Sequence, residues 1–432
     1  MPQSEPLSVD SAVVIVGAGQ GGIQTAISLR SNGFDGAITV IGDEKHEPYQ
    51  RPPLSKAFIS STGGHEEVRL RPSDFYAAQR ISLVLDDPVH EVDRDRQQVV
   101  LTSGQTLAYD RLVIATGVRA RPVPAPGGEL SGVLTIRGLD DATALRTIVA
   151  VTHDTGARPT HIVVIGGGFI GMEFAAMASG FGYPVTVVEA MHRTHARATS
   201  PEVSGHLERA HAEHGNQILL GQGVRRLLGN ADGHVTALEL SDGTTLPADL
   251  VLVGIGVLVN SEFLTGSGLD IAHGVAVDQH LRTADPNISA VGDCAYYPSV
   301  HGQRLMRVES VQNAVDQGRY VAERLVAPDQ GPYASVPWFW THQFKEKVQM
   351  VGIPGPNDIR FVTGDPTSGR FSVLHFADDQ LTCVESVNST ADHMAARKAL
   401  ERGLPVTPDN ARRTDFALAT HVKALIADLA RS

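Results

Sequence analysis

Two segments of this sequence combine a short apolar run with closely spaced glycines, VVIVGAGQGG at 13–22 and HIVVIGGGFIG at 161–171. Both have a Gly-x-Gly-x-x-Gly spacing, made by Gly17, Gly19 and Gly22 and then by Gly166, Gly168 and Gly171. Such glycines allow a sharp turn after a strand, a close approach of the backbone to a pyrophosphate, and tight packing of the following helix. The free N–H groups of that helix can bind phosphate. Two copies predict two bound dinucleotides.

An acidic residue follows each glycine segment at the distance where a ribose diol is bound. The predicted strand Ala37–Ile41 is followed by Gly42 and then Asp43, which lies 21 residues after Gly22. Glu189 ends the strand predicted from Val185 and lies 18 residues after Gly171. We assign Asp43 to an adenosine ribose, although a solvated turn is the alternative interpretation. Glu189 favours NAD over NADP because a carboxylate repels a 2′-phosphate.

Other charged residues have less specific patterns. Arg193 and Arg197 follow Glu189 and could bind a phosphate, or they could be solvated loop charges. The segment PYQRPPLSK at 48–56 is stiffened by three prolines, and we expect a rigid loop that presents Arg51 and Lys56.

Composition and charge exclude several classes of protein. The 432 residues are enough for two or three domains. Lysine and arginine total 36 against 48 acidic residues, and the net charge of −12 argues against nucleic acid or an anionic membrane as the main partner. We expect a cytoplasmic protein because no secretory leader or membrane span is evident.

Only two cysteines are present, Cys294 and Cys383, and they are far apart in the sequence. This spacing forms no CxxC redox pair and no zinc quartet, and we predict no metal site. The chemistry must therefore depend on bound cofactors rather than on a dithiol.

The remaining elements suggest how the chain is divided. A boundary is expected after Ala115-Thr116-Gly117, where arginines and prolines accumulate, and the segment NISAVGD at 287–293 reads as a strand that ends at Asp293. Residues 309–325 are predicted to form an amphipathic helix. From Val336 onward, PWFW and alternating strands at 347–351 and 371–376 indicate a further α+β domain.

The ordered motifs GAGQGG, PYQRPPLSK, ATG, VVIGGGFIGMEFAA, VGIG, AVGDCA, RVESVQNA and VPWFW resemble those of the NADH-dependent ferredoxin reductases of bacterial oxygenase systems. The resemblance covers nearly the whole chain. It implies an α/β fold with two Rossmann-like dinucleotide-binding domains of the glutathione-reductase type and a C-terminal α+β domain. The implied FAD-binding domain is 1–120 with 255–333, the NAD-binding domain is 121–254, and the C-terminal domain is 334–432.

The resemblance also implies individual roles. FAD would be bound by Gly17, Gly19, Gly21, Gly22, Asp43, Arg51, Lys56, Val89, Ala115, Arg137, Asp293 and Val311. NADH would be bound by Gly166, Gly168, Gly171, Glu173, Glu189 and Gly256. Lys56 and Glu173 would form an ion pair at the flavin N5 that orients the rings without acting as an acid or base. Trp338 would lie near the isoalloxazine.

The chain departs from the family pattern at two places. Val259-Asn260 replaces a common Pro-Asn, and the segment 191–199 is rich in histidine and arginine, which bears on the preference for NAD.

The function that these observations favour is the transfer of electrons from NADH through FAD, one at a time, to a two-iron two-sulfur ferredoxin that feeds an oxygenase. One alternative is a reductase of rubredoxin or of a small acceptor. Another is a redox sensor that resembles apoptosis-inducing factor and turns over slowly. A disulfide reductase is disfavoured because the dithiol is absent.

An acidic ferredoxin would need a local basic surface on a chain whose net charge is −12. The candidates are Arg319, Lys345, Lys347, Arg397 and Lys398, each of which could also be an ordinary solvated charge.

The first prediction is a preference for NADH over NADPH. Glu189 should repel the 2′-phosphate of NADPH and lose the hydrogen bond that the 2′-hydroxyl of NADH donates to it, so we expect kcat/KM to be roughly tenfold to a thousandfold higher with NADH. Steady-state kinetics with both coenzymes would measure this ratio. Equal efficiency would remove Glu189 from the coenzyme site.

Overall fold

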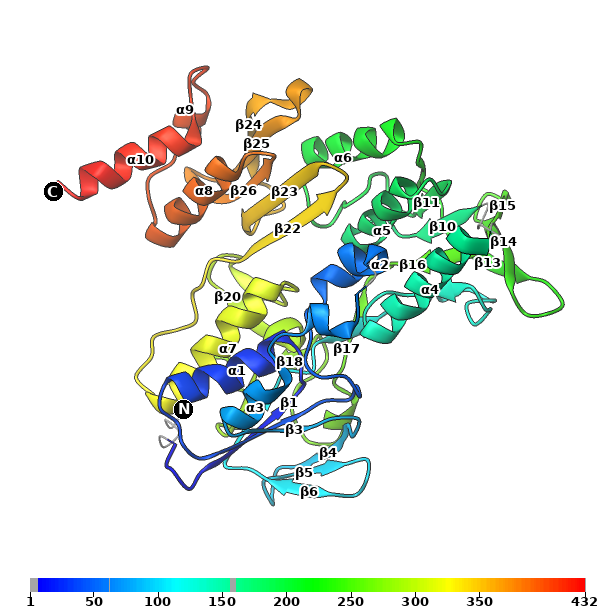
Figure 1. The fold of residues 1–432 in the computed structure, drawn as a ribbon. Coiled ribbons are helices and arrows are strands. Elements are labelled where there is room, and N and C mark those ends of the chain that lie inside the picture. The colour runs from blue at the N-terminus through cyan, green and yellow to red at the C-terminus, as the bar shows by residue number, and fades with distance from the viewer. Residues whose placement is uncertain (1–6, 62, 156–160, 432) are drawn as a thin grey trace. The chain divides into compact units, whose positions relative to one another are not determined.

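A computed structural model describes residues 7–61, 63–155 and 161–431, which fall into two compact units (Figure 1). The first unit contains Met1–Gln50, His65–Arg119 and Leu258–Phe339. The second contains Arg51–Gly64, Ala120–Val257 and Trp340–Ser432. The chain changes unit between residues 50 and 51, between 64 and 65, within the short strands β8 (Val118–Ala120) and β17 (Val257–Val259), and between 339 and 340.

The first unit is built on a parallel sheet in the order β19-β7-β1-β2-β3. Its strands are Ile288–Ala290, Arg111–Ile114, Ala12–Val16, Ala37–Ile41 and Ile81–Val84, in the same order. The chain moves outward from β1 through β2 and β3 and then returns to the other side of β1 with β7. The order of the strands therefore reverses between β1 and β7, which is where open parallel sheets bind ligands.

Helices α1 (Gln20–Ser31) and α7 (Val311–Val326) lie side by side in this unit (Figure 1). They approach closely through glycine, because a Cβ atom on Gly318 would lie 2.8 Å from the carbonyl oxygen of Gly21. The amphipathic helix predicted over 309–325 is confirmed as α7, whose buried face includes Ala314, Gly318 and Ala322. The unit also holds two small sheets, formed by β4 (Val89–Asp93), β5 (Gln98–Leu101) and β6 (Thr106–Ala108), and by β18 (Val275–Ala276), β20 (Ala295–Ser299) and β21 (Arg304–Met306).

The second unit repeats the same architecture with a parallel sheet in the order β12-β11-β10-β16-β9. Its strands are Gln217–Leu220, Val185–Glu189, Ile162–Ile165, Leu250–Val253 and Val133–Leu134, in the same order. The associated helices are α4 (Leu139–Thr155), α5 (Phe169–Gly180) and α6 (Pro201–Glu213). A hairpin sheet is added by β13 (Val224–Gly229), β14 (Val235–Leu240) and β15 (Thr245–Pro247).

The C-terminal part of the second unit is a five-stranded sheet in the order β22-β23-β26-β25-β24. Its strands are Trp338–Gln343, Glu346–Gly352, Gln380–Val387, Arg370–Ala377 and Ile359–Asp365, in the same order. Helix α8 (Thr390–Arg402) packs on β23 and β26, and α10 (Leu418–Leu429) packs on α8. The strands predicted at 347–351 and 371–376 are confirmed as β23 and β25, although 371–376 is buried throughout rather than at alternate residues, and the predicted α/β fold class is correct.

Two local predictions need correction. The proline-rich segment is not a loop, because Pro52–Ser55 forms a 3-10 helix that leads into α2 (Ala57–Ser60). Pro52 and Pro53 occupy the first turn, where their fixed φ angles favour helical backbone. The spacing of Ile170, Phe174, Met177 and Ala178 predicts a single apolar face for α5, but the side chain of Ile170 is 42% exposed, whereas Phe174 and Ala178 are buried.

Within the described residues, no helix is long and apolar enough to cross a membrane, and no cluster of side chains could hold a metal ion.

Both cysteines are free, buried and in different units. The thiol of Cys294 donates to the carbonyl oxygen of Val291 at 3.3 Å. Burial raises the pKa of both thiols, which disfavours the reactive thiolate. These thiols are therefore packing residues.

The second prediction is that the double variant Cys294→Ala and Cys383→Ala keeps its reductase turnover within a few-fold of the unmodified protein. Some loss of stability is expected from the two small cavities. Turnover should be measured on protein whose FAD content has been matched by absorbance. A loss of orders of magnitude with FAD still bound would assign a thiol to the mechanism.

Candidate active site

The first glycine turn has the geometry that a dinucleotide requires. Gly17 has φ +118°, and a Cβ atom there would lie 2.2 Å from the carbonyl oxygen of Ala115. A Cβ atom on Gly22 would lie 2.0 Å from the carbonyl oxygen of Gly17, so helix α1 packs directly on the turn. Gly19, by contrast, faces open space and lets a ligand approach the backbone. This geometry confirms the sharp turn predicted at Gly17 and the close helix packing predicted at Gly22, while the approach of a pyrophosphate at Gly19 stays a prediction.

The N-terminus of α1 follows this turn, with Gly19 at the N-cap position and no hydrogen bond from a capping side chain among the described residues. The first N–H groups of a helix have no acceptor inside the helix. A pyrophosphate at this position would accept those hydrogen bonds and interact favourably with the helix dipole. The residues present therefore fit the adenine dinucleotide part of FAD.

The second glycine turn is built in the same way. Gly166 has φ +103°, and a Cβ atom there would lie 2.4 Å from the carbonyl oxygen of Gly254. A Cβ atom on Gly171 would lie 2.2 Å from the carbonyl oxygen of Gly166. Helix α5 begins at Gly168 and likewise receives no hydrogen bond from a capping side chain in the described part of the chain. This turn fits a second dinucleotide.

The two glycine turns differ in which of two neighbouring positions has the larger side chain. The first turn has Ala18 beside Gly42, and the second has Gly167 beside Glu189. The register of the strands makes Gly42 the counterpart of Glu189, and the glycine segments make Ala18 the counterpart of Gly167. A Cβ atom on Gly42 would lie 2.9 Å from the Cβ of Ala18, so a larger residue does not fit there. This packing explains why the first acid is displaced by one position to Asp43, which is exposed just beyond β2.

In the second turn, Gly167 leaves room for the carboxylate of Glu189. Its Oε2 accepts from the backbone N–H of Gly167 at 2.6 Å, and its Oε1 accepts from the N–H of Met191 at 2.7 Å. A carboxylate has about four acceptor positions, so two are left for a ribose diol. Arg193 donates to Ser204 Oγ at 2.7 Å and to the carbonyl oxygen of Ala196 at 2.9 Å, which reduces its availability for a 2′-phosphate.

The other predicted FAD residues of the first unit lie on separate elements. Asp293 is in the turn Gly292–Cys294, whose Gly292 N–H donates to Gln317 Oε1 of α7 at 2.7 Å. Val311 is the first residue of α7, which is capped by Ser310 through the N–H of Asn313 at 3.1 Å. Val89 is buried in the core of this unit, and Trp338 is half-buried.

In the second unit, Arg51 and Arg137 are in contact. The Nη1 atom of Arg51 donates to the carbonyl oxygen of Arg137 at 2.8 Å. The backbone N–H of Arg137 donates to Asp141 Oδ2 at 2.8 Å, and this carboxylate also accepts from Gly138. Gly256, with φ +103°, lies at the end of the segment after β16, and a Cβ atom there would lie 3.7 Å from Arg197 Nη2.

The predicted pair of Lys56 and Glu173 is present, with Nζ of Lys56 2.6 Å from Oε2 of Glu173. Glu173 is 4% exposed. Its Oε2 also accepts from Ser55 Oγ at 2.8 Å, and its Oε1 accepts from Thr341 Oγ1 at 2.7 Å. A buried carboxylate is tolerated only when charge and hydrogen bonds compensate for its lost hydration. These three donors provide that compensation.

Two of these donors, Ser55 and Thr341, were not predicted from the sequence. Thr341 lies on β22, where buried Thr341 and Gln343 alternate with half-buried Trp340 and exposed His342. Alternate residues of a strand point to the same face, so the polar Thr341 and Gln343 share the inward face of WFWTHQ. This pattern could have indicated a buried polar cluster.

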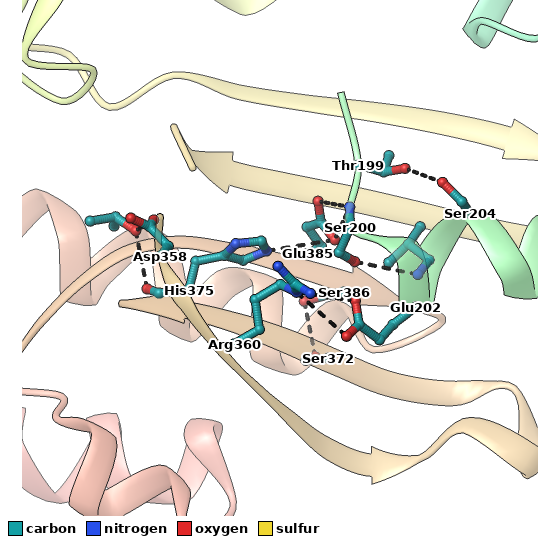
Figure 2. A network of polar contacts seen from close by, with 12 residues as sticks. Thr199, Ser200, Glu202, Ser204, Asp358, Arg360, Ser372, His375, Glu385 and Ser386 are labelled. Carbon is teal, nitrogen blue, oxygen red and sulfur yellow. Dashed lines mark hydrogen bonds and ion pairs between the residues drawn. The ribbon is translucent and has the colours of Figure 1, made fainter. Parts of the chain in front are cut away.

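Helix α6 is joined to the C-terminal sheet by a buried carboxylate (Figure 2). Ser200 caps α6 by accepting from the N–H of Val203. The backbone N–H of Ser200 donates to both oxygens of Glu385, at 2.9 and 3.0 Å. In a capping box, the backbone N–H of the capping residue donates to a polar side chain three residues later in the helix. That position is Val203 here, whose side chain cannot accept a hydrogen bond. Glu385 on β26 accepts this hydrogen bond instead. The start of α6, which follows the segment after Glu189, is thereby held to the C-terminal sheet of the same unit.

Comparisons with known proteins agree with this arrangement. A family model described as pyridine nucleotide-disulphide oxidoreductase matches residues 11–318, and one described as reductase C-terminal matches residues 338–422. Rhodocoxin reductase of Rhodococcus erythropolis is 46% identical over 407 residues, which cover 94% of this chain and 93% of that protein. Putidaredoxin reductase of Pseudomonas putida is 38% identical over 407 residues, covering 93% and 94%.

The crystal structure of a covalent putidaredoxin reductase–putidaredoxin complex contains a chain with the same fold. It superposes with a TM-score of 0.90 at 36% sequence identity and covers 98% of this chain and 100% of that chain.

The third prediction concerns two buried histidines, His195, whose backbone contacts the second glycine turn, and His211 on α6. Burial lowers the pKa of His195 to about 3 and that of His211 to about 4. The unfolded chain binds these protons near pH 6.5, so the free energy of unfolding should fall as the pH drops below that value. Each histidine should contribute up to about 1.4 kcal/mol per pH unit.

Denaturant unfolding at about pH 7 and about pH 5 would measure the loss. The variant His211→Gln should lose about 2 kcal/mol less than the unmodified protein between these values. Replacement of the exposed His192 by Gln is the control and should leave the slope unchanged. Equal slopes in all three proteins would contradict the assignment.

Proposed function

The chain belongs to the ferredoxin reductases within the pyridine nucleotide-disulphide oxidoreductase family, and on this premise we propose that its acceptor is a two-iron two-sulfur ferredoxin that serves an oxygenase. As a member of this family the chain uses FAD and NADH. The three-domain division at 1–120 with 255–333, 121–254 and 334–432, and a cytoplasmic location, are part of the same proposal.

One observation carries the choice of an external acceptor. The structure contains two dinucleotide turns, yet both thiols are buried and lie in different units. Electrons that enter from NADH then have no disulfide within the chain to reduce, so they must leave to another molecule. Bound FAD supplies the conversion that this exit requires, since it accepts a hydride and releases electrons one at a time.

The residues of the first unit would hold FAD. Gly17, Gly19, Gly21 and Gly22 would bind the pyrophosphate at α1, Asp43 would bind the adenosine ribose, and Asp293 would bind the ribityl chain. Val89 and Ala115 would line the site through their backbone. We assign the N-terminus of α7, at Val311, to the side of the flavin where negative charge accumulates, because the helix dipole stabilises an anion. Trp338 would lie against the ring.

The second unit would hold NADH through Gly166, Gly168, Gly171, Glu189 and Gly256. Arg51 would lie near the flavin, and Arg137, whose carbonyl oxygen accepts a hydrogen bond from Arg51, would lie on the adenine side or at the pyrophosphate. The pair of Lys56 and Glu173 would orient the reacting rings. Because Glu173 is already satisfied by Lys56, Ser55 and Thr341, its role is to hold charge in place rather than to transfer a proton.

Steady-state turnover tests this proposal. The purified protein should reduce a two-iron ferredoxin rapidly with NADH and should reduce rubredoxin much more slowly. Slow turnover with every protein acceptor, together with tight NADH binding, would favour a redox sensor instead.

The basic docking residues predicted from the sequence differ in availability. Lys345 and Lys398 are exposed. Lys347 is half-buried and donates to Thr390 Oγ1 at 3.4 Å, Arg397 pairs with Glu401 at 3.4 Å, and Arg319 is 3.8 Å from Asp316. Lys345 and Lys398 are therefore the better candidates in the second unit.

The fourth prediction is that the double variant Lys345→Glu and Lys398→Glu slows reduction of an acidic ferredoxin several-fold at low salt and weakens its salt dependence. Charge steering is screened over about 10 Å at 0.1 M salt. Reduction of ferricyanide, which needs no docking surface, should change little. Arg209→Glu, the reversal of one exposed charge on α6, is the control for each of the two single reversals. Parallel losses with both acceptors would place the damage at the cofactors and not at a docking surface.

A further inference from the structure

A chain of buried side chains connects Glu173 with the second glycine turn, and all of its members belong to the second unit. Gln343 stands at its centre. The amide nitrogen of Gln343 is 3.4 Å from Thr341 Oγ1 and 3.1 Å from His195 Nε2, and its oxygen is 3.0 Å from His211 Nε2. Thr341, Gln343, His195 and His211 are each at most 4% exposed.

The direction of every hydrogen bond in this chain follows from Glu173. An ionised carboxylate can only accept, so the single hydroxyl proton of Thr341 goes to Glu173 Oε1 at 2.7 Å. Thr341 must then accept from Gln343, which places the amide NH₂ toward Thr341 and the amide oxygen toward His211. His211 must donate from Nε2. His195 must accept at Nε2 from the second N–H of Gln343.

The outer ends of the chain agree with this assignment. Asn216 Nδ2 donates to His211 Nδ1 at 2.8 Å, as required if that nitrogen carries no proton. His195 Nδ1 then carries the proton and donates to Thr194 Oγ1 at 3.1 Å, and Thr194 donates onward to Glu208 at 3.0 Å. The two histidines are thus neutral and in opposite tautomers.

The backbone of His195 connects this series of hydrogen-bonded side chains to the second glycine turn. Its N–H donates to the carbonyl oxygen of Gly167 at 2.8 Å, and Gly167 also binds Glu189. His195 has φ +52°, a strained value for a residue other than glycine, which the buried side-chain bonds must maintain.

We propose that Gln343 is a positioning residue that orients Glu173 through Thr341 and the second glycine turn through His195. This inference rests on the proposed role of Glu173 and of that turn in binding the coenzyme. Gln343 itself touches no cofactor in this proposal. Its amide is suited to the task because it offers two donors to one side and an acceptor to the other.

The variant Gln343→Glu has nearly the same shape but cannot donate to Thr341 or to neutral His195. The hydroxyl of Thr341 can then turn to the new carboxylate, and Glu173 loses one donor. Gln349→Glu is the matched control, since Gln349 is a buried glutamine on the adjacent strand β23 that binds Thr390. Thr341→Val cuts only the branch that leads to Glu173.

Affinity for NAD⁺ should be measured by calorimetry, and the histidine tautomers by ¹⁵N NMR of histidine-labelled holoenzyme. As the fifth prediction, we expect Gln343→Glu and Thr341→Val to weaken NAD⁺ binding about tenfold and Gln349→Glu to leave it within about twofold. In the unmodified protein, His195 should be protonated at Nδ1 and His211 at Nε2. Gln343→Glu should alter the signals of both histidines.

Two results would overturn the inference: identical tautomers at His195 and His211, or equal effects of Gln343→Glu and Gln349→Glu on NAD⁺ binding. Neither measurement involves ferredoxin. A failure of the proposed ferredoxin reduction would therefore be seen separately, in turnover of the unmodified protein.

Discussion

The burial of the Glu173 carboxylate is the constraint on which the second unit depends. Breaking a buried ion pair by removing one partner typically costs about 3–5 kcal/mol, since the remaining charge is left without hydration. Glu173 therefore requires Lys56 and Ser55 from the segment before α2 and Thr341 from β22 to stay in place. Segments that are far apart in the chain are held together by the requirements of a single charge.

The same logic applies at Glu385, where a second buried carboxylate joins α6 to the C-terminal sheet. Here the donor is the backbone N–H of Ser200, and the interaction completes a helix cap that α6 cannot complete alone. The C-terminal sheet is thereby integrated into the dinucleotide-binding part of its unit. Its strand β22 supplies Thr341 and Gln343 to the interior, where they bind Glu173 and His195.

Backbone contact is the corresponding constraint at both dinucleotide turns. Gly17 lies against Ala115 and Gly166 lies against Gly254, each too close for a side chain. These contacts occur where the strand order reverses, so the first loop after the central strand is tied to the loop of the neighbouring strand. Such close backbone contacts restrict the conformations open to each turn, and a restricted turn would lose less entropy when a ligand binds.

The sequence by itself determined the repeated strand–turn–helix units, the acids that follow them and the pairing of Lys56 with Glu173. Glycine spacing and apolar periodicity are local properties of the chain and specify backbone conformation directly, while the ion pair followed from the resemblance to a family. Only the tertiary structure decided that Ala18 leaves no room for an acidic side chain at position 42. It also decided that PPLS is helical and that Ile170 faces outward. It also decided the partners of Glu173 and the direction of the bonds through Gln343, because donors separated by well over a hundred residues become neighbours only when the sheets and helices have packed.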